Sequence, residues 1–387
     1  MESTRGENSN RVGSNGNIVT NKEKNTFEKP VEERKKSENI KIHRKESEVK
    51  DGIERQNKKR RSIVRIIGDI LEAGWICFKL TVFISIVTIV VGFLLSRDMM
   101  IRGRNGNRLS VEGMVRSSAV TVNKATEDEK VEKWLKKAKR TKVTLEADDM
   151  RILVARQIVV DAESDKWVVV LHGYNGTMED IYDIARHYAE QGYNIFMPDL
   201  RGHGESEGMF LGMGWLDRLD VINWIDVILE QNPSAKVVIH GVDIGADTAL
   251  MLSGEPVKSS IKAIVAEGAY NNAWEVEKKE YKARHEKLPV FPFLHMINPV
   301  MKVWAGYALT DADAVKQVKA STIPILLIHG GNDIYASDDM TQELEQAIVA
   351  PHEVLMITTG THEDCRYAEP DTYYQKTFDF VEKYVTP

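Results

Sequence analysis

The stretch that decides the fold reads Ile-His-Gly-Val-Asp-Ile-Gly-Ala-Asp over residues 239–247. An apolar run precedes it and a helical run follows it, so the pattern predicts a strand, a sharp turn and a helix. Gly241 and Gly245 flank Asp243 with the spacing of a nucleophile elbow, G-x-S-x-G, which has Ser at its centre. So tight a turn tolerates only glycine-sized residues beside the central one. The sequence therefore predicts an elbow that presents a carboxylate where a hydroxyl is expected.

Apolar runs alternate with amphipathic segments from residue 143 onward. The runs read RILVARQIVV, KWVVVLHG, NIFMPDL, KVVIHGVD, IKAIVAEG, PILLIHG and HEVLMITT. Helical segments are expected near residues 178–191, 215–231, 245–254, 338–348 and 371–385. This alternation is typical of a mostly parallel sheet with helices on both faces, with catalytic groups at the carboxyl ends of its strands. We predict such an α/β domain over residues 141–387.

The first part of the chain differs in charge from the rest. Residues 1–65 carry 18 Lys and Arg and 11 Asp and Glu, a net charge of +7, so the total of −6 leaves −13 for the remainder. A basic tail suits an anionic membrane surface, although composition alone favours a solvated tail without structure. We predict a disordered basic tail over residues 1–70.

A long apolar stretch follows the tail. Residues 75–95 read WICFKLTVFISIVTIVVGFLL, with Lys79 as their single charge. At about 1.5 Å per residue, this length crosses a hydrocarbon core of about 30 Å. We predict a transmembrane helix over residues 71–96 and a polar stalk over 97–140. We also expect the α/β domain to fold without the span.

The predicted span defines a single-pass protein of the cell membrane, which contacts the bilayer through residues 75–95. Positive charges flank both ends in similar number, so the local charge balance does not set the orientation. If the N-terminus stays in the cytoplasm, the long basic tail does not have to cross the membrane. We therefore expect a cytoplasmic N-terminus, with the α/β domain outside.

Two further residues lie where parallel strands end. Asp333 follows the penultimate predicted strand, and His362 follows the last one. The chain order of elbow, acid and histidine is that of α/β-hydrolases, in which the acid holds the histidine tautomer. The alternative to a catalytic role for Asp333, considered by itself, is that it is an ordinary loop residue that makes a hydrogen bond within a turn. Together with Asp243, these residues form the predicted catalytic set.

Six stretches carry a resemblance to a known family. They are HGYNG (172–176), PDLRGHGESEG (198–208), GMGWLDRLDVINWI (212–225), HGVDIGADTA (240–249), IHGGND (328–333) and GTHED (360–364). With them, residues 131–385 resemble the α/β-hydrolase superfamily, and within it the bacterial membrane-anchored hydrolases related to the serine aminopeptidase group. The resemblance implies the α/β-hydrolase fold, with the backbone N–H groups of Tyr174 and Ile244 as oxyanion-hole donors. It also implies a small cap at about 271–312. The cap's aromatic residues suit an apolar substrate, or they form the cap's own core.

Family members typically have Ser where this chain has Asp243. Enzymes resembling haloalkane dehalogenases and epoxide hydrolases use a carboxylate nucleophile on this fold, which attacks an sp³ carbon to form an ester. Those families usually carry Pro shortly after the His-Gly pair and Trp after the Asp, whereas this chain has Asn175 and Ile244 at these places.

We therefore expect a membrane-anchored hydrolase that acts on a small or lipophilic substrate. The family resemblance implies hydrolysis of an ester or an amide. The other expected reaction is one in which the Asp243 carboxylate is the nucleophile. The alternative is a catalytically silent relative that binds or scaffolds at the membrane. The glycines of 202–208 lack the G-x-G-x-x-G pattern of nucleotide sites, and no metal-ligand motif stands in the sequence. We expect no cofactor, no metal and no nucleic-acid partner.

Overall fold

The computed structural model describes residues 31–101 and 117–386, which fall into two compact units, 1–81 and 82–387. In the first unit the described residues are helical throughout and belong to α1 (Val31–Met100), which ends in the second unit. Part of the predicted disordered tail, residues 1–30, lies outside the described residues, but residues 31–70 are helical. Their Lys, Arg, Glu and Gln have high helix propensity, and pairs such as Arg44 and Glu48, one turn apart at 3.3 Å, support the helix.

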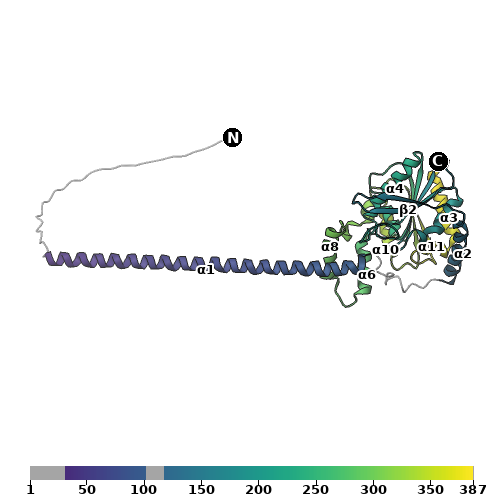
Figure 1. Cartoon of the computed structure of the whole chain (residues 1–387). Coiled ribbons are helices and arrows are strands. Elements are labelled where there is room, and N and C mark those ends of the chain that lie inside the picture. The colour runs from purple at the N-terminus through teal and green to yellow at the C-terminus, as the bar shows by residue number, and fades with distance from the viewer. Residues whose placement is uncertain (1–30, 102–116, 387) are drawn as a thin grey trace, which may run out of the picture. The chain divides into compact units, whose positions relative to one another are not determined.

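One eight-stranded sheet forms the centre of the second unit, in the order β1-β2-β4-β3-β5-β6-β7-β8 (Figure 1). β2 pairs antiparallel with β1 and β4, and the other neighbours are parallel. This confirms the predicted fold class. The strands are β1 Thr141–Glu146, β2 Ile152–Ile158, β3 Lys166–Leu171, β4 Asn194–Pro198, β5 Lys236–Val242, β6 Ile261–Glu267, β7 Ile325–Gly330 and β8 His352–Ile357.

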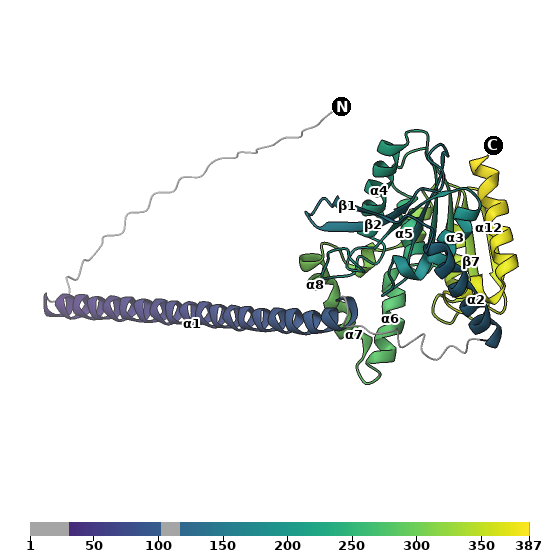
Figure 2. The ribbon, with the colours of Figure 1, turned by 45° about the vertical axis from the view of Figure 1, so that its right-hand side comes forward.

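Helices cover both faces of this sheet (Figure 2). Side chains alternate along β3: Val168 and Val170 belong to one buried cluster, and Trp167 and Val169 belong to the other. On the first face lie α3 Tyr182–Glu190, α11 Cys365–Ala368 and α12 Pro370–Val385, with α2 Ser118–Leu135 packed on α3 and α11. On the second face lie α4 Asp217–Gln231, α5 Ile244–Leu252, α9 Ala314–Val318 and α10 Asp338–Ala347.

A helical insertion separates β6 from β7, in the region where the cap is predicted. It contains α6 Ala273–Arg284, α7 Val290–Phe293, η2 Leu294–Met296, α8 Ile297–Trp304 and η3 Leu309–Asp311. Tyr281 and Tyr307 are fully buried, so these two aromatic residues serve the core. Phe291 and Trp304 are exposed.

The last turns of α1 belong to the core of the second unit. Leu95, Met99 and Met100 are buried there, and the amide of Leu211 donates a hydrogen bond of 2.9 Å to the Met100 carbonyl. A Cβ at Gly92 would lie 2.1 Å from the backbone oxygen of Met296, so this approach requires glycine. The last turn of the predicted span thus contacts protein through Gly92 and Leu95, and folding of the domain without the span stays a prediction.

Helix α1 also contains a stretch that is long and apolar enough to cross a membrane, with a mean hydropathy of 2.4 and 11% of its residues buried. Large side chains within it are exposed, including Trp75, Phe83, Ile86 and Leu94. Water is an unfavourable environment for so much apolar surface. The helix is thus a candidate membrane span, consistent with the predicted one.

If Met100 supports the core as described, Met100→Ala should lower the free energy of unfolding by about 2–5 kcal/mol, because a cavity remains where a buried side chain was. The matched control is Met209→Ala, which truncates a methionine side chain that is 59% exposed and should change stability by less than about 0.5 kcal/mol. Denaturant unfolding of the full chain in detergent measures both. Equal effects would show that the end of α1 is not part of the core.

Candidate functional site

The predicted elbow is present between β5 and α5. Asp243 has φ 51° and ψ −120°, a strained conformation for a residue with a side chain. A Cβ at Gly241 would lie 2.2 Å from the Gly245 carbonyl oxygen, and a Cβ at Gly245 would lie 2.4 Å from that of Leu171. Both flanking glycines are therefore required by close backbone contacts, and the strain directs the Asp243 side chain to the ends of the strands.

The structure brings the three predicted catalytic residues together. His362 Nδ1 lies 2.8 Å from Asp333 Oδ2, and His362 Nε2 lies 3.4 Å from Asp243 Oδ1. The backbone amides of Tyr335 and Ala336 donate to Asp333 Oδ1 at 2.8 and 2.9 Å. The loop after β7 thus holds the Asp333 carboxylate in place, and this carboxylate holds the His362 ring. All three side chains of the set are buried.

The two predicted oxyanion-hole residues flank the elbow. The amide of Tyr174 donates a hydrogen bond of 2.8 Å to Asp243 Oδ2, and Ile244 begins α5 directly after the elbow. The Tyr174 hydroxyl donates to the backbone oxygen of Met99 at 3.1 Å, which connects this loop to the end of α1. Tyr174 therefore lies against the carboxylate that replaces the usual hydroxyl. The role of Ile244 remains a prediction.

Two buried histidines, His172 and His203, hold the loop that carries Tyr174. His172 Nε2 accepts from the Leu200 amide at 2.9 Å, and its Nδ1 lies 2.8 Å from the Gly173 carbonyl oxygen. Burial lowers the pKa of His172 to about 4, so it is uncharged at neutral pH. His203 Nε2 accepts from the Asn175 amide at 3.3 Å. These residues set the shape of the loop and lie outside the catalytic set.

Glu363 is a site residue that the sequence analysis did not single out. Its backbone has φ 60°, and its Oε1 lies 4.0 Å from His362 Nε2. A Cβ at Gly173 would lie 2.4 Å from the same oxygen, so the glycine makes room for this carboxyl group. Burial and the charge of Asp243 raise the pKa of Glu363 to about 8. Glu363 is therefore largely protonated at neutral pH. The one feature of the sequence that could have pointed to Glu363 is that it directly follows His362.

His362 lies between two carboxylates and is held in its charged form. Burial disfavours the charge, but Asp333 and Asp243 outweigh that effect and raise the pKa of His362 well above its usual value. An imidazolium cannot accept a proton. In this resting arrangement the histidine therefore becomes a base only after Asp243 loses its negative charge.

A buried ion-pair network supports the segment that carries His362. The Arg366 guanidinium contacts Asp183 at 2.7 Å and Glu267 at 3.2 Å. Glu267 Oε1 also accepts from the Cys365 amide at 3.0 Å. Because Glu267 is the last residue of β6 and its backbone oxygen accepts from the Asp243 amide, the network connects the elbow to the histidine segment. The sequence analysis did not identify these residues.

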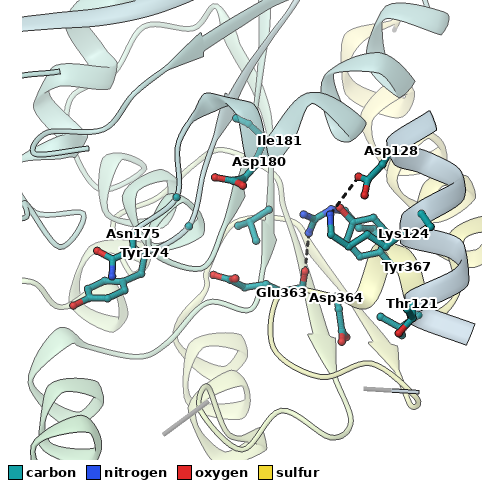
Figure 3. Close-up of a pocket in the computed structure, with 16 residues that line it drawn as sticks. Thr121, Lys124, Asp128, Tyr174, Asn175, Asp180, Ile181, Glu363, Asp364 and Tyr367 are labelled. Carbon is teal, nitrogen blue, oxygen red and sulfur yellow. Dashed lines mark hydrogen bonds and ion pairs between the residues drawn. The ribbon is translucent and has the colours of Figure 1, made fainter. Parts of the chain in front are cut away.

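A cavity of about 600 Å³ opens beside the site. Figure 3 shows Tyr174 and Asn175 on one side of it and Lys124 and Asp128 of α2 on the other. Glu363 also lines it, so the cavity reaches the edge of the buried catalytic set. On the side of α2 its lining is mixed, with Thr121, Lys124 and Asp128 beside Val120 and Ala125.

Three potential metal ligands also meet here. One ligand atom each of Asp243, His362 and Glu363 lies within 4.8 Å of the others. The sequence analysis expects no metal site. It had no spacing motif to detect, because Asp243 comes from a different strand end, far from the other two residues in the chain.

A family model described as the alpha/beta hydrolase fold matches residues 166–289. The second unit is an α/β-hydrolase-fold domain.

Several known proteins are similar to this chain at low sequence identity. The chain is 22% identical over 226 residues to the uncharacterised protein YqkD of Bacillus subtilis, covering 58% of this chain and 73% of that protein. It is 24% identical over 226 residues to the uncharacterised protein YfhR of Escherichia coli, and the match covers 57% of this chain and 71% of that protein. Among solved structures it resembles the Pyrococcus furiosus esterase Pf2001, with 21% identity and a TM-score of 0.53. The match covers 64% of this chain and 92% of the esterase chain. It also resembles a Mycobacterium tuberculosis puromycin-hydrolyzing peptidase, with 15% identity and a TM-score of 0.51. The match covers 64% of this chain and 40% of the peptidase chain.

The charge state of His362 can be tested by NMR of the ¹³C-labelled histidine rings. We expect its titration midpoint to lie well above 6.5, the usual value. Asp243→Asn should lower this midpoint, because a negative charge beside the ring is removed. Asp371→Asn, at an exposed position in α12, should leave it unchanged. An unchanged midpoint in Asp243→Asn would show that the elbow carboxylate does not control the histidine.

Proposed function

We propose that this protein is a membrane-anchored hydrolase in which Asp243 is the nucleophile, attacking an sp³ carbon of a small or lipophilic substrate. The observation that carries the proposal is the orientation of the Asp243 carboxylate. Its Oδ2 accepts the Tyr174 amide at 2.8 Å, and its Oδ1 faces His362 Nε2 at 3.4 Å. One oxygen is thus held by a backbone donor, while the other is directed at the catalytic histidine.

This orientation supports a two-step reaction. Asp243 Oδ1 attacks a carbon that carries a halide or an epoxide oxygen, the bond to that leaving group breaks, and an alkyl ester forms on Asp243. The ester has no negative charge, so the pKa of His362 falls and the ring releases its proton to solvent. For an epoxide, protonated Glu363 is a proton donor for the oxygen that becomes a hydroxyl.

The second step regenerates the carboxylate. His362 takes a proton from a water molecule, and the resulting hydroxide attacks the ester carbon, Cγ of Asp243. Negative charge then develops on Oδ2, which the Tyr174 amide already contacts. When the intermediate collapses, the bond from Cγ to the substrate oxygen breaks, His362 gives its proton to that oxygen, and an alcohol leaves. The new carboxyl group of Asp243 then passes its proton to His362, which restores the carboxylate and the imidazolium. Asp333 holds the His362 ring in place in both its neutral and its charged form.

Trapping the ester tests this chemistry. His362→Gln should accumulate an ester on Asp243 when the full chain in detergent is incubated with a panel of epoxides and haloalkanes, because hydrolysis needs the base and alkylation does not. Mass spectrometry of the peptide that contains Asp243 detects the adduct. Asp243→Asn should form none, and His43→Gln, an exposed histidine of α1, should behave like the wild type. An adduct that persists in Asp243→Asn would place the nucleophile elsewhere.

A second candidate is a catalytically silent protein that binds or scaffolds at the membrane. The observation that favours it is the charged His362, which cannot activate a serine-type nucleophile. If no substrate alkylates the wild type, and folded Asp243→Ser reacts with neither fluorophosphonate nor esters, this candidate replaces the first. Reactive Asp243→Ser would instead show that the machinery related to the serine aminopeptidase group is intact.

Membrane anchoring is the remaining part of the proposal, with the N-terminus inside the cell and the α/β domain outside. The exposed apolar side chains of α1 support it. Ile86→Arg combined with Ile89→Arg should move the protein from the membrane pellet to the supernatant after an alkaline wash, since each arginine costs about 2.5–3.5 kcal/mol in the bilayer. Ile42→Arg with Ile53→Arg, in the basic part of α1, is the control and should stay in the pellet. Protease accessibility in intact cells reports the orientation.

A further inference from the structure

We propose that Asp243, His362 and Glu363 form a binding site for one divalent transition-metal ion of the Zn²⁺ type. Binding itself does not depend on the proposed function, but its consequence does, because the ion would occupy the nucleophile. Ligand atoms of the three residues lie within 4.8 Å of one another. They come from the elbow and from the segment after β8, the two segments that the Arg366 network holds together.

The distances fit a tetrahedral ion with little movement. Metal–ligand bonds of about 2.0–2.1 Å place neighbouring tetrahedral ligands about 3.3 Å apart. His362 Nε2 lies 3.4 Å from Asp243 Oδ1 and 4.0 Å from Glu363 Oε1. The first pair is already at the required separation. The second closes by a rotation of the Glu363 side chain, whose carboxyl group borders the cavity.

His362 has the features of a metal-binding histidine. Its side chain is 3% exposed, and its Nε2 faces Asp243 Oδ1 at 3.4 Å. Its Nδ1 contacts Asp333 Oδ2 at 2.8 Å. A histidine that gives one ring nitrogen to a carboxylate and the other to a metal is the usual arrangement in zinc proteins, since the carboxylate fixes the ring and makes it a better ligand. Asp333 is therefore the positioning residue of this site.

The set of donors indicates the class of ion. One imidazole nitrogen and two carboxylate oxygens suit zinc and similar transition metals, whereas magnesium and calcium prefer oxygen ligands. Binding requires His362 and Glu363 to release their protons to solvent, and the two carboxylates then balance the charge of the divalent ion. Of the three ligands Glu363 lines the cavity, which offers the ion a path of entry. An ion bound to Asp243 Oδ1 would block alkylation, so Zn²⁺ should inhibit the proposed hydrolase.

Isothermal titration with ZnCl₂ tests the site directly, with the full chain in detergent and without a polyhistidine tag. We expect one site that His362→Gln and Glu363→Gln each weaken by roughly a hundredfold or more. Asp333→Asn should weaken it by about 10–100-fold, as loss of a carboxylate behind a ligating histidine does. X-ray absorption at the zinc edge should show one imidazole in the wild type and none in His362→Gln, a change that a merely structural effect would not produce.

Matched controls separate this site from weak surface binding. His43→Gln removes an exposed histidine near Glu46, and Glu179→Gln removes an exposed carboxylate, so both should bind Zn²⁺ like the wild type. Equal affinity of wild type and His362→Gln would overturn the inference. Zinc binding by the wild type, together with no ester on Asp243 in the zinc-free protein, would contradict the proposed function alone. Ester formation with no zinc binding, and no inhibition by zinc, would contradict the metal site alone.

Discussion

The contact between the Asp243 carboxylate and the His362 ring is the interaction on which the site depends. A buried carboxylate is costly unless it is paired and hydrogen-bonded. Here the Tyr174 amide contacts one oxygen and the charged ring of His362 faces the other. Each of these partners requires its own support. The Tyr174 loop needs His172 and His203, and the ring needs Asp333. The acid at the elbow is thus accommodated by its surroundings.

The site and the candidate membrane helix share one core. The last turns of α1 are buried in the α/β domain, and the backbone oxygen of Met99 accepts a hydrogen bond from the Tyr174 hydroxyl. The amide of that same tyrosine contacts Asp243. Two hydrogen bonds therefore connect the end of α1 to the elbow. In the proposed function, the anchor contributes to the shape of the site as well as holding the enzyme at the bilayer.

Sequence reasoning identified what strand ends and short motifs encode. The elbow glycines, Asp333 and His362 each follow a predicted strand, and parallel strands bring such residues to one edge. It missed Glu363, whose importance comes from positive φ and the space beside Gly173, neither of which composition reveals. It also assigned Leu95 to the membrane span and Met100 to a polar stalk, because an apolar side chain gives the same sequence signal whether it contacts lipid or protein. The helix over 31–70 was missed because charged composition suggested disorder.

The central claim is that Asp243 carries the substrate as an ester whose acyl carbon is attacked by water. A single turnover in ¹⁸O-labelled water tests it most directly. The account predicts that the label enters the carboxyl group of Asp243, while the first alcohol released carries an unlabelled oxygen from the enzyme or the epoxide. Mass spectrometry of the Asp243 peptide and of the product measures both. Label in an alcohol formed from a haloalkane, with none in Asp243, would contradict the account.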